Sequence, residues 1–234
     1  MKRIGRILAH WLYPGPVTCL CCDRPIENDS PDGLLCSLCC KSLEHLFGIQ
    51  EQRSQGHNPP EGLAFLYAAY PYEAQAKTLV HRLKYDRLRR AAIPLARAMF
   101  LLPAGEEEMI VPVPTTKVRK RQRGFNQSAL LADWLAREYG MPCCESALVR
   151  TDDAPSQTEL TAKQRAENVR NSMKAASLVR GKRILLVDDV YTTGATAREA
   201  CRALREAGCR SVGMFAACLA GQKDSDQKAP DFLR

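Results

Sequence analysis

The residue types best suited to binding a small anion occur together in residues 182–196, Lys-Arg-Ile-Leu-Leu-Val-Asp-Asp-Val-Tyr-Thr-Thr-Gly-Ala-Thr. Near the end of this segment a glycine allows a ligand to approach the backbone closely, and threonines supply hydroxyl groups. Backbone N–H groups in the first turn of a helix, together with the positive end of the helix dipole, bind phosphate groups well. We therefore predict that a phosphate monoester binds to Thr192, Thr193, Gly194, Ala195 and Thr196.

Two carboxylates precede this loop, at Asp188 and Asp189. Carboxylates accept hydrogen bonds from ribose hydroxyls and lie close to hard cations such as Mg²⁺. A ligand that carries a phosphate, two vicinal hydroxyls and a metal-bound pyrophosphate matches the whole segment, and that ligand is phosphoribosyl pyrophosphate (PRPP). We predict Asp188 and Asp189 as catalytic residues; the alternative is a strand with two edge acids and a capped helix, without this ligand.

The residues around the acids predict a strand, a short loop and a helix. Residues 184–187 form a continuous apolar run, which is typical of a strand buried on both faces of a parallel sheet. Residues 195–207 are rich in alanine and end at Gly208, as expected of a helix that a glycine terminates. The loop then lies at the carboxyl edge of an α/β sheet, where open folds of this class bind ligands.

A second strand is predicted at residues 109–114, Met-Ile-Val-Pro-Val-Pro. Its prolines lack a backbone N–H, so the strand must end there, again at an edge of the sheet. The loop that follows, Thr115, Thr116 and Lys117, is a candidate pyrophosphate site, while the alternative for the arginines after it is a solvated basic turn. Further donors after this loop are Arg119, Arg123, Asn126 and Gln127.

Eleven cysteines in a chain without secretory features indicate metal binding before disulfides. Residues 19–22 and 36–39 each contain a Cys-x2-Cys pair, and two such pairs supply four thiolates to one tetrahedral Zn²⁺. The site would be structural, because so short a segment buries too little apolar surface to fold without metal; the alternative is incidental clustering. The predicted ligands are Cys19, Cys22, Cys36 and Cys39, with Cys21 and Cys40 as alternatives in the register.

The order of these segments predicts two modules. We expect an N-terminal helix and zinc ribbon at 1–47, a polar linker at 48–62, an α/β domain at 63–221 and a flexible tail at 222–234. No apolar run approaches the length of a membrane span, and the protein is predicted to be cytoplasmic. The net charge of +8 has three explanations, which are attraction of a phosphate ligand, attraction of nucleic acid, and solubility alone.

The segment from Asp188 to Thr196 resembles the PRPP-binding motif of the type I phosphoribosyltransferases. Together with the cysteine pairs, Leu83-Lys-Tyr, Val111-Pro-Val-Pro and Arg123-Gly-Phe-Asn-Gln, it resembles the ComF family, which joins a zinc ribbon to a phosphoribosyltransferase-like domain. The resemblance spans residues 19–196. It implies further loop or anion-binding residues, which are Lys84, Tyr85, Arg150, Gln157, Arg165 and Asn168.

This resemblance implies binding of Mg²⁺–PRPP and a role in natural competence, in uptake of DNA or in its use as a nutrient. Thr192 replaces the aspartate that serves as general base in the salvage enzymes for hypoxanthine and guanine, which argues against that substrate class. One hypothesis is a phosphoribosyltransferase whose acceptor the motifs do not identify. The other is a non-catalytic module that senses PRPP or binds single-stranded DNA and competence proteins.

Overall fold

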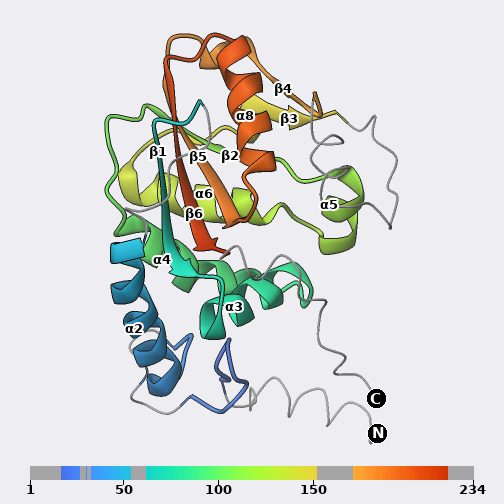
Figure 1. The fold of residues 1–234 in the computed structure, drawn as a ribbon. Helices are drawn as coiled ribbons and strands as arrows, with labels where there is room; N and C mark the ends of the chain where they lie inside the picture. The colour runs from blue at the N-terminus through green and yellow to red at the C-terminus, as the bar shows by residue number, and fades with distance from the viewer. Residues whose placement is uncertain (1–16, 27–29, 31–32, 54–61, 152–170, 221–234) are drawn as a thin grey trace, which may run out of the picture.

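The main domain is built on one parallel sheet of four strands (Figure 1). The computed structural model describes residues 17–26, 30, 33–53, 62–151 and 171–220. Across the sheet the order is β1-β6-β5-β2, and every neighbouring pair is parallel, which confirms the predicted α/β class. The strands are β1 (Phe65–Pro71), β2 (Met109–Pro112), β5 (Arg183–Tyr191) and β6 (Ser211–Leu219).

Helices cover both faces of this sheet, which explains why its central strands are continuously apolar (Figure 1). One face packs on α8 (Ala195–Glu206), and the other packs on α4 (Ala92–Phe100) and α6 (Gln127–Tyr139). Successive residues of β5 alternate between the two cores, with Leu185 on the α4 and α6 side and Leu186 on the α8 side. The central strand is therefore fixed from both faces.

A second, antiparallel pair of strands lies against α8 and consists of β3 (Leu148–Arg150) and β4 (Met173–Ala175). The buried carboxylate of Glu199 on α8 accepts a hydrogen bond of 3.0 Å from the backbone N–H of Met173. Arg202 donates to the same carboxylate oxygen at 2.8 Å. These contacts attach the small sheet to the helix that follows the predicted phosphate loop.

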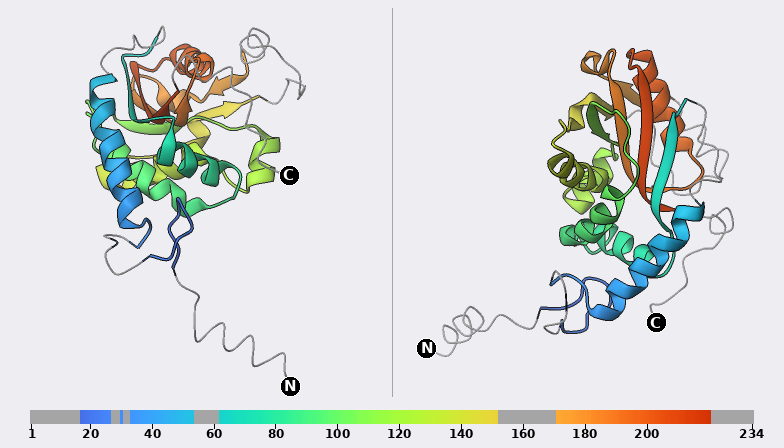
Figure 2. Two further views of the ribbon diagram at one scale, coloured as in Figure 1. Left: turned by 60° about the horizontal axis from the view of Figure 1, so that its bottom comes forward. Right: turned by 90° about the vertical axis from the view of Figure 1, so that its left-hand side faces the viewer.

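The N-terminal cysteine-rich turns and α2 (Ser37–Arg53) pack against the edge of the main domain at β1 and α3 (Ala74–Lys84) (Figure 2). Leu43 of α2 belongs to the same buried core as Leu79 and Leu83 of α3. The two modules therefore share one core. In addition, α2 occupies the first part of the range 48–62 that was predicted as a linker, while the predicted N-terminal helix and C-terminal tail lie outside the described residues.

Strand β5 is longer than the sequence predicts. Its apolar run ends at Val187, but pairing with β6 continues to Tyr191, so that the two acids lie inside the strand instead of after it. The partner on the other side, β2, pairs only as far as Pro112 because prolines end it. The last residues of β5 consequently have a neighbouring strand on one side and α6 on the other.

A helix, α5 (Lys117–Arg123), occupies the segment for which the sequence predicts a loop with donor residues, with a solvated basic turn as the alternative. The hydroxyl of Thr116 caps it by accepting a hydrogen bond of 3.2 Å from the N–H of Arg119. Gly124 ends it with a left-handed φ of 83°. A cap at one end and a glycine at the other thus fix a single short helix.

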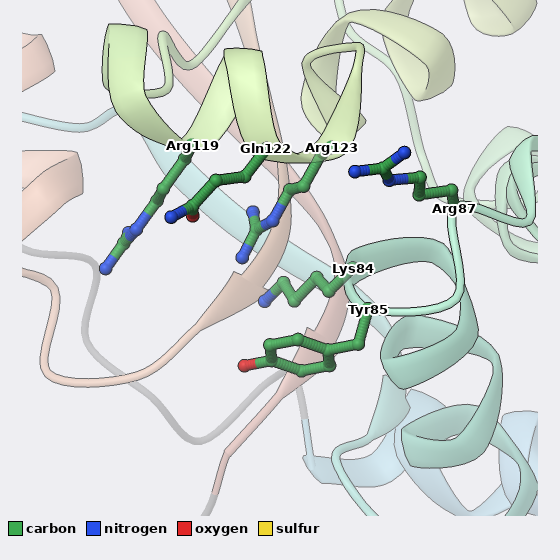
Figure 3. A pocket seen from close by; sticks show the side chains of 6 residues that line it. All are labelled: Lys84, Tyr85, Arg87, Arg119, Gln122 and Arg123. Carbon is green, nitrogen blue, oxygen red and sulfur yellow. The ribbon is translucent and has the colours of Figure 1, made fainter.

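The helical region after β1 consists of two helices that are separated by a short turn. Helix α3 ends at Lys84, and a 3₁₀ turn at Arg89–Ala91 leads into α4. The break brings the end of α3 close to α5, on the opposite side of the pocket described below (Figure 3). Among the described helices, none is both long enough and apolar enough to traverse a bilayer.

Candidate functional site

The loop between β5 and α8 has a backbone suited to holding a phosphate group. Gly194 precedes the helix with a φ of 75°, in the left-handed region. A Cβ atom at Gly194 would lie 2.5 Å from the hydroxyl of Tyr191, so that a larger residue would displace this side chain in addition to straining the backbone. Thr192 and Thr193 are exposed, and the first turn of α8 begins directly after them. The first N–H groups of the helix are therefore presented at an open loop.

Asp188 receives two hydrogen bonds on one oxygen. The hydroxyl of Ser128 and the backbone N–H of Asp189 each donate to its Oδ1 at 2.8 Å. Burial, and then the charge of Asp189, raise the pKa of Asp188 to about 7. A cation or a group that donates hydrogen bonds would stabilise the ionised form, which is what a metal-bound sugar phosphate supplies.

Asp189 is paired with Lys84 at the end of α3. The Nζ of Lys84 lies 3.1 Å from Oδ2 of Asp189, and both side chains are largely buried. Burial acts to lower the pKa of Lys84, but the charges of Asp189 and Asp188 outweigh it and the pKa is raised. Lys84 therefore remains protonated and acts as the internal counter-ion of the two acids.

Two buried polar atoms lie in the turn that positions Ser128. They are Oδ1 of Asn126 and Nε2 of Gln127, and within the described residues neither has a hydrogen-bond partner. The Nδ2 of Asn126 donates to the carbonyl oxygen of Val113 at 3.0 Å, which fixes this side chain. Leaving a buried polar atom unpaired costs about 1–3 kcal/mol, and such atoms are typical of sites that bind a ligand.

The residues predicted to bind pyrophosphate lie at the beginning of α5. Thr115 precedes the helix, Thr116 caps it and Lys117 is its first residue. Farther along α5, Arg119 and Arg123 face the end of α3 across a pocket of about 370 Å³ (Figure 3). We call this the α3–α5 pocket. Its lining residues are Lys84, Tyr85, Arg87, Arg119, Gln122 and Arg123.

The fold thus brings together predicted residues from three separate segments. Lys84 contacts Asp189 and also lines the α3–α5 pocket, which links the acids to Arg119 and Arg123. Arg150, in contrast, ends β3 in the separate antiparallel sheet. The remaining predicted loop residues, Gln157, Arg165 and Asn168, lie outside the described residues.

Sequence reasoning missed three residues of the site. Ser128 binds Asp188, while Arg87 and Gln122 line the α3–α5 pocket. Ser128 follows the predicted Asn-Gln pair directly, and this proximity was the available signal. Arg87 and Gln122 carry no local signal, since only the approach of α3 to α5 gives them a role.

The four cysteines of the two Cys-x2-Cys pairs form one cluster, in which all ligand atoms lie within 4.8 Å of one another. These are the four that the predicted register selects. The thiol of Cys21 is directed toward the carbonyl oxygen of Gln75 at 3.9 Å, and that of Cys40 toward that of Leu35 at 4.0 Å. Four converging sulfur atoms are the donor set of a structural zinc site. Its members are Cys19, Cys22, Cys36 and Cys39.

The environment of Cys19 also favours a metal-bound thiolate. Burial alone would raise its pKa, but hydrogen bonds from neighbouring backbone N–H groups outweigh burial and lower the pKa to about 7. One of these groups, the N–H of Cys21, lies 3.4 Å from the sulfur. The Cys19 sulfur is therefore suited to bind a cation as a thiolate, and the four sulfur atoms together match the donor set of Zn²⁺.

Comparison with known proteins places the whole arrangement in one family. Residues 126–233 match the phosphoribosyl transferase domain family. The chain is 29% identical over 228 residues to the DNA utilization protein YhgH of Escherichia coli (strain K12), with 92% of this chain and 94% of the relative covered. It is 32% identical over 161 residues to the YhgH protein of Salmonella typhimurium (strain LT2), with 65% and 71% covered.

Bacillus subtilis supplies a third relative. Competence protein ComFC of Bacillus subtilis (strain 168) is 37% identical over 109 residues, which cover 46% of this chain and 42% of that protein. The matches agree with the site geometry, in which an acid pair lies within a buried parallel strand and a glycine loop follows that strand. The chain therefore belongs to the ComF family, and its α/β domain is of the phosphoribosyltransferase type.

Proposed function

We propose that the protein binds Mg²⁺–PRPP and transfers its 5-phosphoribosyl group to an acceptor, with release of pyrophosphate. The observation that carries this proposal is the end of β5, where Asp188 and Asp189 lead directly into the Gly194 loop and α8. The two unpaired buried polar atoms beside Ser128 also support a polar ligand at this end of the strand.

In this proposal each part of the ligand has its own residues. The acids Asp188 and Asp189 accept hydrogen bonds from the ribose hydroxyls, residues 192–196 hold the 5′-phosphate, and residues 115–117 hold the pyrophosphate. Mg²⁺ would neutralise the pyrophosphate and make it a better leaving group. The proposed catalytic residues are Asp188 and Asp189.

The transfer needs charge stabilisation more than acid or base chemistry. When the bond between C1′ and the pyrophosphate oxygen breaks, its electron pair leaves with pyrophosphate and C1′ becomes electron-poor. A lone pair of the acceptor then forms the new bond, and the acceptor loses a proton to solvent. Negative charge on the carboxylates of Asp188 and Asp189 would stabilise the positive charge that develops on the ribose.

Calorimetric titration of the zinc-loaded protein with PRPP, with and without Mg²⁺, tests the proposal. We expect Mg²⁺-dependent binding that falls at least about a hundredfold in Asp188→Asn/Asp189→Asn, because two charge-assisted contacts are lost. The control Asp133→Asn/Glu138→Gln removes the same charge from two exposed residues of α6 and should bind as the wild type does. A folded wild type that binds no PRPP contradicts the proposal.

A second candidate function is binding of single-stranded DNA. Helix α5 is basic, contains no acid and buries none of its side chains. The ring of Tyr85 nearby is 67% exposed, and aromatic rings beside cations are typical of surfaces on which bases stack. If this surface binds DNA, affinity should fall steeply with salt, and the slope should flatten when Arg119, Arg121 and Arg123 are replaced by glutamine.

We further propose that Cys19, Cys22, Cys36 and Cys39 hold a structural Zn²⁺. The compact cluster of the four sulfur atoms supports this proposal. Residues 1–47 would then be the metal-binding module and residues 63–221 the phosphoribosyltransferase domain, joined through a common core.

A further inference from the structure

We propose that the α3–α5 pocket is a second phosphate-binding site, and that its ligand is a nucleoside monophosphate. Three of its lining residues come from the end of α3 and the turn after it, and three come from one face of α5 (Figure 3). Phosphate binding in the pocket requires only the residues that line it. Its role as the site of the acceptor rests on the proposed transfer from PRPP.

The charges of the pocket are not balanced by the protein. Four cations and no carboxylate line it, and only Lys84 is engaged by an acid, Asp189. In the described part of the chain, no carboxylate forms an ion pair with Arg87, Arg119 or Arg123. Three guanidinium groups that converge on a concave surface fit the dianion of a phosphate monoester.

Helix α5 by itself has few interactions that stabilise it. It is seven residues long, buries none of its side chains, and carries like charges four residues apart at Lys117 and Arg121 and at Arg119 and Arg123. A different face is compensated, since Lys120 pairs with Glu145 at 2.8 Å. On the pocket face the repulsion persists, and a bound anion would remove it.

The remaining lining residues suit the base and sugar of a nucleotide. Tyr85 exposes most of its ring, and the guanidinium of Arg123 lies 5.7 Å from the ring centroid. Gln122 adds an amide that can donate and accept hydrogen bonds. A volume of about 370 Å³ lies within the range of sites for small molecules. A phosphate attached to a flat heterocycle therefore matches the pocket better than an inorganic anion does.

The position of the pocket relates it to the proposed PRPP site. The phosphates of PRPP are already assigned to residues 192–196 and 115–117, so that the arginines of the pocket are additional cations. Lys84 lies between the pocket and Asp189, in contact with the acid and in the pocket wall. A nucleotide in the pocket would consequently lie beside the ribose, where an acceptor has to approach C1′.

The test uses the full-length, zinc-loaded protein and two probes, thymidine 5′-monophosphate and thymidine. In Arg119→Gln/Arg123→Gln we expect the affinity for the monophosphate to fall about tenfold or more, since two charge-assisted contacts are lost. The control Lys120→Gln/Arg137→Gln removes the same charge outside the pocket and should change this affinity less than about twofold. Thymidine should bind weakly to all three proteins, and thermal unfolding of each variant confirms that it is folded.

Titration of the same three proteins with Mg²⁺–PRPP separates the outcomes. If Arg119→Gln/Arg123→Gln weakens PRPP as much as the monophosphate, the pocket holds the pyrophosphate of PRPP and the proposal is wrong. The proposal is also wrong if the wild type does not bind the monophosphate but binds oligothymidylate with the same affinity whether its end carries a 5′-phosphate or a 5′-hydroxyl. If the wild type binds the monophosphate through the pocket but binds no PRPP, the proposed phosphate site is supported and the proposed transfer reaction is wrong.

Discussion

At the scale of single residues, the contact between Lys84 and Asp189 sets the charge of the site. It joins the last residue of α3 to the end of β5, two segments that are far apart in the sequence. The sequence identified both residues, one by the Asp-Asp motif and one by resemblance alone. It did not show their contact, because no local pattern records which helix end meets which strand end.

Replacing Lys84 by methionine should change the affinities for cation and anion in opposite directions. Without the ammonium group, the two acids attract Mg²⁺ alone about tenfold more strongly, while Mg²⁺–PRPP binds about tenfold more weakly because a positive charge facing its phosphates is lost. Separate calorimetric titrations with MgCl₂ and with Mg²⁺–PRPP measure both. Lys174→Met, on the outer strand β4, is the control. A parallel loss of both affinities would indicate instead that Lys84 only holds α3 in place.

The raised pKa of Asp188 predicts a particular pH dependence of stability without ligand. Because the pKa is about 7 in the folded protein and lower in the unfolded chain, the folded form binds the extra proton between these values. The free energy of unfolding should therefore decrease as the pH rises from about 4 to about 7, by at most about 1.4 kcal/mol per pH unit. Urea unfolding of the zinc-loaded protein across this range measures the slope.

The variant Asp188→Asn isolates this contribution from that of the other titrating groups. Its amide oxygen can still accept from Ser128, but it carries no proton to lose, so the slope should be shallower than in the wild type. Asp133→Asn, at an exposed position of α6, should keep the wild-type slope. Identical slopes in all three proteins would show that Asp188 does not bind the extra proton.

At the scale of elements, two glycine variants separate the effect of backbone strain from the effect of the loop between β5 and α8 on ligand binding. Gly194→Ala places a Cβ against the hydroxyl of Tyr191, whereas Gly140→Ala introduces the same left-handed strain with nothing within 4 Å. Both variants should lose about 1 kcal/mol of stability from the backbone conformation. Only Gly194→Ala should also lose affinity for PRPP, about tenfold or more, because the Cβ displaces side chains at the loop that holds the phosphate. Equal affinities in the two variants would exclude the loop from the binding site.

The elements also show what sequence patterns can and cannot predict. The buried part of β5 and helix α8 followed from an apolar run and from an alanine-rich segment that ends at a glycine, and both patterns are local. The extension of β5 to Tyr191 depends on a long partner strand, and no property of the Asp-Asp segment itself reveals it. Helix α5 was missed for another reason. Its basic composition suggested a solvated turn, although Thr116 and Gly124 supply the signals for a beginning and an end.

At the scale of the whole molecule, the cysteine cluster should stabilise more than its own module. Cys39→Ser should lose the bound zinc and lower the midpoint of thermal unfolding by about 10 °C or more in a single transition, since each kcal/mol moves the midpoint by about 2–4 °C for a protein of this size. Cys40→Ser is the matched control, because its thiol lies outside the cluster. Atomic absorption measures the zinc content of each variant, and calorimetry measures its thermal unfolding transition. Two separate transitions, or equal zinc loss in both variants, would contradict this expectation.

The common core of α2 and α3 has a practical consequence for work with fragments of this protein. Leu43 and Leu46 of α2 bury the same cluster as Leu79, Val80 and Leu83 of α3. A recombinant fragment that starts near residue 62 would expose this leucine-rich face to water and should be recovered mainly in inclusion bodies. Producing residues 1–53 in the same cells as a separate polypeptide should restore soluble material. The cysteine-rich segment is thus part of the common core and not a separable module.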